Sequence, residues 1–190
     1  CIQWRGKGII QVNFIIVSRI IYPMTLEAAT EVASNLLPED HREVLEGHGH
    51  DPVESIPLTV FNCDSISFRM PDGRLAGIAG VYEDGQIWML CTPVILKYPV
   101  TFAREARRYV EQRTEKLLWN IVDERNTVHL KLLRFLGFKF LRRLKYGPNN
   151  LSFIEFCKIN HGNLGSSRCN SISRDGNHIR QQTIQTSKVS

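Results

Sequence analysis

The chain carries a short segment rich in histidine and acidic residues, whose side chains suit proton transfer. Glu43, His48, His50 and Asp51 follow one another closely within EVLEGHGHDP. A glutamate or a histidine can act as a general base toward an amine. Two histidines at i and i+2 are only a weak metal signal, because no third ligand is nearby. The simpler interpretation is a turn in which His50 and Asp51 cap a helix that begins at Pro52.

A later segment, LLWNIVDERNTVHLKLLRFLGF, predicts a strand, a capped helix and a turn into a second strand. Residues 117–122 are short and apolar, which is typical of a buried strand. Asn126 is suited to cap the following helix, because its side chain can accept hydrogen bonds from first-turn N–H groups. Gly137 permits the left-handed conformation that ends a helix, and Phe138 then packs back onto the core. His129, on this helix, is expected to be a surface or packing residue.

Apolar periodicity and turn residues predict the other elements that position these side chains. Helices are expected over residues 25–37, 38–47, 52–56 and 99–116. Strands are expected over 65–70, 75–82 and 86–91, joined by tight turns into an antiparallel meander. The helical crossover places strand 117–122 parallel to strand 86–91. With strands near 139–144 and 151–157, the prediction is an α/β fold (α+β mixed sheet) with helices on both faces.

Length and composition fit one globular domain, predicted to span residues 24–160. The formal net charge is +5, but the positive excess lies in the flanks, so no specific nucleic-acid surface is expected. Within the domain the first half is acidic and the second half is basic. Residues 1–23 are interpreted as a non-native or disordered extension, because Met24 is the first possible start. Residues 161–190 are interpreted as a disordered polar tail, because large apolar residues are few.

Two further classes of protein are disfavoured by the sequence. The apolar run 9–21 is interrupted by polar residues and is shorter than the roughly 20 residues that span a bilayer, so no membrane span is expected. No small-residue cleavage site follows it, so no secretion signal is expected either. The five cysteines are widely spaced and contain no C-x-x-C pair, which suits a reduced compartment and argues against structural zinc.

The strand, the N-x-x-x-x-x-x-L-x-x-L-G-F segment that begins at Asn126, and the strand after it resemble the acyl-CoA-binding core of the GNAT superfamily of N-acyltransferases. Further sequence segments in the same order are similar to a small GNAT-like family of internal virion proteins from short-tailed, podovirus-type phages. These segments are LPEDHREVLEGHGHDPVESI, GRLAGIAGV, IWMLCT and YGPNNLSFIEF. The resemblance covers nearly all of residues 24–160. It implies a single-domain GNAT-like fold in the bacterial host cytoplasm or the phage virion, with other virion proteins or a second copy of the chain as partners.

The same resemblance implies where an acetyl-CoA or CoA cofactor would bind if the protein is active. Active GNAT enzymes carry Q/R-x-x-G-x-G/A after the central strand, and its glycines let backbone N–H groups approach the pyrophosphate. The corresponding segment here, residues 92–99, contains no glycine. Lys97 and Thr101 could bind an anion, although a solvated lysine is the simpler interpretation. The implied cofactor-binding residues are Cys91, Thr92, Lys97, Thr101 and Asn126.

The resemblance also implies the catalytic positions. Many of these enzymes place a tyrosine acid seven residues after the asparagine, but this chain has Leu133 there, which cannot protonate a thiolate. The region after the first helices usually lines the acceptor cleft in this fold, so Glu43 and His50 are the catalytic candidates, with no metal. Two hypotheses follow. The favoured one is an internal virion or assembly protein with a degenerate acyltransferase site. The alternative is an acyl-CoA-dependent N-acetyltransferase acting on a protein or a small amine.

Overall fold

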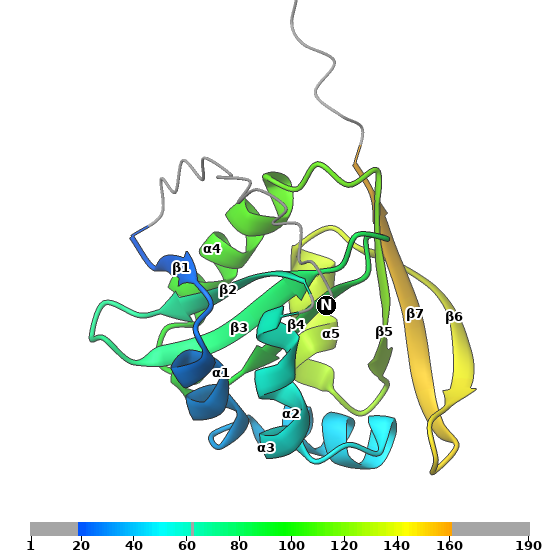
Figure 1. Ribbon diagram of the computed structural model, residues 1–190. Helices are drawn as coiled ribbons and strands as arrows, with labels where there is room; N and C mark the ends of the chain where they lie inside the picture. Colours follow the sequence, from blue (N-terminus) through cyan, green and yellow to red (C-terminus); the bar gives the residue numbers. More distant parts are fainter. Residues whose placement is uncertain (1–18, 62, 161–190) are drawn as a thin grey trace, which may run out of the picture.

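The computed structural model describes residues 19–61 and 63–160, which form two β-sheets with helices packed around them (Figure 1). The first sheet is antiparallel with the order β1-β2-β3-β4. Its strands are β1 (Ile21–Pro23), β2 (Asp64–Arg69), β3 (Leu75–Val81) and β4 (Ile87–Cys91). The second sheet, antiparallel with the order β5-β7-β6, consists of β5 (Leu117–Asp123), β6 (Lys139–Tyr146) and β7 (Leu151–Ile159).

The helical elements fall into an early group, before β2, and a late group around β5. The early group is α1 (Leu26–Ala33), α2 (Pro38–Arg42), a π-helical turn (Glu43–His48), α3 (Pro52–Ser55) and a 3-10 helix (Ile56–Phe61). The late group is a 3-10 helix (Pro93–Leu96), α4 (Pro99–Glu111) and α5 (Thr127–Phe135). No helix in residues 19–61 and 63–160 is long and apolar enough to cross a membrane.

Two apolar clusters hold these layers together. All seven residues of β3 are buried, so the first sheet has a covered face on each side. On one side α1 packs through Ala29 and Val32 against Leu75 and Ile78. On the other side, side chains of α4 pack with those of β2, β5 and β7 in a larger apolar cluster. Its members include Phe68, Phe102, Tyr109, Leu118 and Phe156. The prediction of helices on both faces is confirmed for this sheet.

The predicted ends of the helix after β5 are confirmed in detail. The Asn126 side chain accepts a hydrogen bond from the His129 N–H at 3.1 Å, which caps the first turn of α5. Gly137 has a φ of +84°, and the Phe138 N–H donates to the Leu133 carbonyl at 3.0 Å. This is the left-handed helix end that the glycine predicted.

The predicted single sheet is instead two sheets that meet at one point. The parallel orientation of β4 and β5 is confirmed by an isolated bridge between Gln86 and Trp119, beyond which the strands separate. The Asn120 side chain lies at this point, and its amide donates to the Ile87 carbonyl at 2.8 Å. Its oxygen accepts from Gln86 Nε2 at 3.2 Å. The Ile87 carbonyl of β4 is therefore hydrogen-bonded to the Asn120 side chain and is not available to the β5 backbone.

Other boundaries differ from the sequence expectation by a few residues. The ordered sheet begins before Met24, because β1 pairs with β2 and Ile21 is buried in the larger cluster. The long helix predicted to residue 116 ends at Glu111. The helix predicted over 38–47 occurs as α2 followed by the π-helical turn. Residues 1–18 and the expected polar tail 161–190 lie outside the described residues.

The hairpin between β6 and β7 packs against the π-helical turn so closely that one glycine has no room for a side chain. Gly147 has a φ of +73°, and a Cβ added there would lie 1.7 Å from the Gly47 carbonyl oxygen. Gly73 has a similar φ of +83° with nothing within 4 Å of an added Cβ. Alanine at Gly73 therefore introduces backbone strain alone, whereas alanine at Gly147 introduces backbone strain and a steric clash.

We expect Gly73→Ala to lower the free energy of unfolding by about 1–2 kcal/mol, the cost of a left-handed alanine. Gly147→Ala should lower it by at least about 2 kcal/mol more, because the π-helical turn must also move away. Urea unfolding of both variants measures the difference. Equal losses would show that the hairpin does not press against this turn.

Candidate functional site

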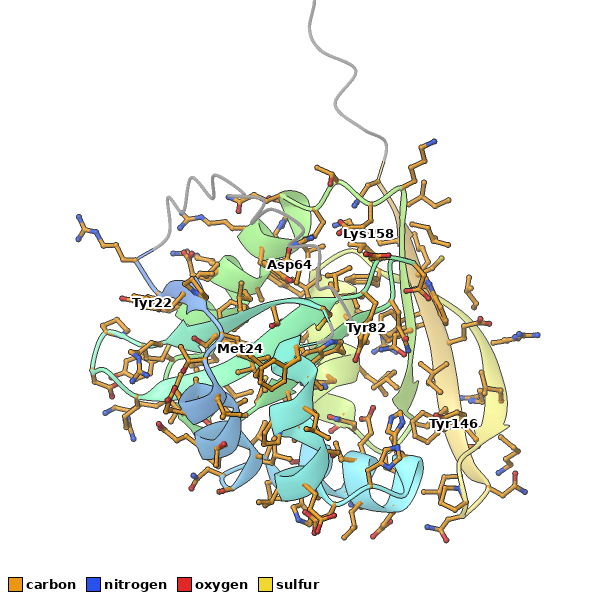
Figure 2. All side chains as sticks on the ribbon, in the orientation of Figure 1. Tyr22, Met24, Asp64, Tyr82, Tyr146 and Lys158 are labelled. Atoms are coloured by element: carbon orange, nitrogen blue, oxygen red, sulfur yellow. The ribbon has the colours of Figure 1, made fainter. Side chains whose placement is uncertain are left out.

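A cavity of ≈ 430 Å³ lies where β4 and β5 separate. Its apolar lining side chains include Ile87, Met89, Val110, Leu132, Leu133 and Phe138. Its polar lining residues fall into two groups along the chain, with Tyr82, Gln86 and Asn120 in one group and Glu43, His48, His50 and His129 in another. Figure 2 labels Tyr82, which follows β3 and contributes to the lining. The cavity can therefore hold a largely apolar ligand that carries polar groups.

A buried polar cluster borders the second group. Asp40, on α2, has no exposed surface, and its Oδ2 accepts a hydrogen bond from the Cys91 N–H at 2.7 Å. Asn126 Nδ2 donates to Asp40 Oδ1 at 2.9 Å and to Glu43 Oε2 at 2.9 Å. One amide thus links two carboxylates from the early helices to the start of α5. These bonds compensate for the loss of water around the buried acidic groups.

The π-helical turn places Glu43 and His48 on the cavity, and the second sheet supports this turn from outside. Asn149 Nδ2 donates to the Glu46 carbonyl at 2.8 Å, which ties the β6–β7 hairpin to the turn. Tyr146, labelled in Figure 2 near the end of β6, brings its hydroxyl to 3.4 Å from His48 Nδ1. Burial lowers the pKa of His48. π-helical turns often occur at functional sites.

The carboxyl group of Glu43 is the titrating group most strongly affected by the cavity. Burial of this carboxylate raises its pKa from 4.5 to about 7, against the opposing effects of His129 and the Asn126 hydrogen bond. Its proton affinity therefore suits proton exchange near neutral pH. Burial also raises the pKa of the Cys91 thiol well above its usual value, so this cysteine is not a thiolate nucleophile on its own.

The predicted catalytic candidates lie on the cavity. Glu43 and His50 both line it, and His50 is exposed at its edge. The capping interpretation is confirmed for Asp51, whose Oδ1 accepts from the Val53 N–H at 2.8 Å. Leu133, at the expected position of the acid, also lines the cavity. Glu43, His50 and Leu133 therefore line one cavity, and the catalytic role of Glu43 and His50 stays a prediction.

None of the five predicted cofactor-binding residues lines the cavity, and their role stays a prediction. The Thr92 hydroxyl is buried and donates to the Leu75 carbonyl at 2.7 Å. Lys97 is mostly exposed and lies 3.6 Å from a carboxylate oxygen of Asp72. Thr101 is exposed on α4. The Cys91 side chain is fully buried, and the Asn126 amide is already bonded to two carboxylates.

Sequence reasoning missed His129, which is neither a surface residue nor a fully satisfied packing residue. It is 8% exposed and lines the cavity, and its Nε2 has no hydrogen-bond partner. The sequence feature that could have identified His129 as a site residue is its position one turn after the Asn126 cap. Asp40 was missed as well, because its partners Cys91 and Asn126 are 51 and 86 residues away in the chain.

Comparison with known proteins identifies the fold. No family model matches the sequence, and no curated protein matches it. The spermidine N-acetyltransferase of Vibrio cholerae, solved with CoA and spermine, is 11% identical, with a TM-score of 0.54 over 73% of this chain and 94% of that chain. A GNAT-family acetyltransferase from Streptococcus pneumoniae is 15% identical, with a TM-score of 0.52 over 74% and 98%. One from Bacillus anthracis is 11% identical, with a TM-score of 0.53 over 70% and 88%.

The chain therefore has the fold of GNAT-family acetyltransferases. This confirms the predicted α/β class and the predicted order of elements. Identities this low establish the fold alone, so chemistry has to be argued from the cavity and its side chains.

The raised pKa of Glu43 predicts how stability changes with pH. The folded state binds this proton more tightly than the unfolded state, so the contribution is full below about pH 4.5 and is lost as pH rises through about 7. We expect a loss of about 3 kcal/mol over this range. Glu43→Gln should remove this part of the pH dependence. Urea unfolding at pH 5 and pH 8 measures it.

The matched control for this prediction is Glu31→Gln, since Glu31 is exposed on α1. It should keep the pH dependence of the unaltered protein. The same dependence in Glu43→Gln would contradict the assignment of the raised pKa to Glu43.

Proposed function

We propose that this protein is an internal virion or assembly protein of a short-tailed phage, built on a GNAT fold whose acyltransferase site is degenerate. One observation supports the claim that the acyltransferase site is degenerate. The segment between β4 and α4, where active enzymes bind the CoA pyrophosphate, uses its own backbone donors internally. A phosphate cradle requires N–H groups that point at the ligand.

The hydrogen bonds of this segment account for most of its N–H groups. Pro93 and Pro99 have no backbone N–H group. The Thr92 N–H donates to the carbonyl of Ala76 on β3 at 2.9 Å, just after the β3–β4 pairing. Four further donors bond back along the 3-10 helix and its exit, and they are the N–H groups of Val94, Ile95, Lys97 and Tyr98. Without a glycine, these donors cannot readily turn outward to a pyrophosphate.

The phage role is supported by the four sequence segments that resemble a family of internal virion proteins. It is also supported by Leu133, which offers no proton to a departing thiolate at the cavity. A structural role needs neither a cofactor nor an acid, so both departures fit a protein retained for its surface and not for catalysis.

Calorimetric titration tests the degenerate site directly. CoA and acetyl-CoA, added to the full chain, should show no saturable binding up to millimolar ligand. The spermidine N-acetyltransferase of Vibrio cholerae, which has been solved with CoA, is the positive control. A micromolar dissociation constant for this chain would overturn the claim that the pyrophosphate site is lost.

The particle role has a separate test. Mass spectrometry of purified particles of the phage that encodes this chain should detect it in a fixed ratio to the other virion proteins. Its absence from particles, together with no effect of deleting the gene on particle yield, would contradict both a virion role and an assembly role.

The second candidate is an active acyl-CoA-dependent N-acetyltransferase, favoured by the placement of Glu43 and His50 on the cavity. Glu43 would take one proton from an ammonium group, and the amine nitrogen would attack the thioester carbonyl. The C–S bond would then break, the nitrogen would lose its second proton to solvent, and the departing CoA thiolate would take a proton from solvent. This candidate predicts CoA binding in the same titration, and acetyl transfer that Glu43→Gln abolishes.

A further inference from the structure

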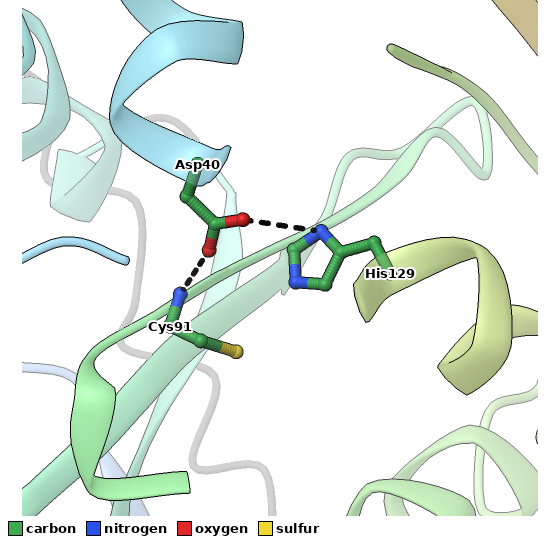
Figure 3. A group of neighbouring side chains, drawn as sticks. All are labelled: Asp40, Cys91 and His129. Carbon is green, nitrogen blue, oxygen red and sulfur yellow. Dashed lines mark hydrogen bonds and ion pairs between the residues drawn. The ribbon is translucent and has the colours of Figure 1, made fainter. Parts of the chain in front are cut away.

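We propose that Asp40, Cys91 and His129 form a binding site for a transition-metal dication of the zinc class, beside the inner wall of the cavity. Among residues 19–61 and 63–160 they are the group of three whose ligand atoms all lie within 4.8 Å of one another. All three are buried. Figure 3 shows the Asp40 carboxylate of α2 between the backbone nitrogen of Cys91, on β4, and the ring of His129, on α5. This proposal is independent of CoA binding.

The strongest observation is that the imidazole of His129 lacks a well-formed hydrogen bond at either nitrogen. Nε2 is buried with no partner. Nδ1 lies 3.4 Å from Asn126 Nδ2, but the two hydrogens of that amide are already directed at Asp40 and Glu43, each at 2.9 Å. A buried polar group without partners needs a specific explanation, and a bound ion is one.

The imidazole has one nitrogen free for a metal ion. Its Nδ1 faces Asp40 Oδ1 at 3.6 Å, which is longer than an ordinary N–H···O hydrogen bond, so the unpartnered Nε2 is the ligand atom. The ligand atoms of the three residues lie within 4.8 Å of one another. Donors on a tetrahedral zinc ion, with bonds of about 2.0–2.3 Å, lie about 3.3–3.8 Å apart, so the three side chains move closer together when the ion binds.

The surrounding hydrogen bonds orient the ligands before a metal arrives. Asp40 is held by the Cys91 N–H at 2.7 Å and by Asn126 Nδ2 at 2.9 Å, and each of its oxygens retains a further lone pair. Outer hydrogen bonds of this kind fix ligand geometry at metal sites. His129 also lines the cavity, so a fourth coordination position would face ligand or water there.

The chemistry of the three donors selects the metal. A thiolate, an imidazole and a carboxylate are zinc-class ligands, whereas magnesium and calcium prefer oxygen ligands alone. Binding replaces the thiol proton by the metal, so one proton is released to solvent as the S–Zn bond forms. The sequence argued against structural zinc because no C-x-x-C is present. These ligands come from separate elements, which that spacing rule does not detect.

Cobalt and zinc ions are the probes for this site. The full chain, stripped with chelator, should bind one equivalent of Co²⁺ with a thiolate-to-cobalt charge-transfer band in the near ultraviolet. Cys91→Ser should abolish this band, and His129→Gln should weaken binding at least tenfold. Cys63→Ser and Cys157→Ser are matched controls because both are free cysteines outside the cluster, and both should retain the band.

The test remains decisive if the buried variants fail to fold. X-ray absorption on the zinc-loaded unaltered protein should show one sulfur at about 2.3 Å with nitrogen or oxygen donors near 2.0–2.1 Å. A zinc shell without sulfur would overturn the proposal. Absence of any bound Co²⁺ or Zn²⁺, or binding that disappears in His50→Ala but persists in Cys91→Ser, would also overturn it.

Discussion

The Asn126 side chain makes the interactions on which the rest of this site depends. Its oxygen caps α5 through the His129 N–H, and its amide bridges the carboxylates of Asp40 and Glu43. Asp40 in turn bonds the Cys91 N–H at the end of β4. Three parts of the chain are thereby fixed relative to one another: the early helices, the end of β4 and the helix after β5. Buried carboxylates make this network costly to break.

A second asparagine, Asn120, lies where the two sheets meet. Asn120 bonds a β4 carbonyl through its side chain, and β4 and β5 separate beyond this contact. The cavity exists because the strands separate there, while the Asn126 network holds the far side together. The cavity thus combines apolar and polar side chains in its lining.

Local sequence signals predicted the elements that local interactions determine. The Asn126 cap, the left-handed Gly137 and the position of Leu133 on the cavity all follow from residues within one or two helical turns. Signals that depend on distant partners were not visible. Asp40 has its partners 51 and 86 residues away, and His129 is distinguished by the hydrogen bonds it lacks. The separation of the two sheets was not visible either, because periodicity does not encode which strands pair.

The glycine-free segment after β4 could be recognised from sequence, but its consequence required the structure. The Thr92 hydroxyl and the neighbouring backbone donors are hydrogen-bonded within the protein, which supports our proposal that the segment does not bind a pyrophosphate. Under this proposal, one chain combines the fold of an acetyltransferase with a changed pyrophosphate segment.

The most direct test of this account is a double-mutant cycle between Asp40→Asn and Asn126→Ser, measured by urea unfolding. Serine keeps an acceptor for the α5 cap and removes only the bridging amide. The account predicts a coupling energy of about 2 kcal/mol, as expected for a buried hydrogen bond to a charged group. A coupling below about 0.5 kcal/mol would mean that the two residues act independently and that the bridge does not organise the site.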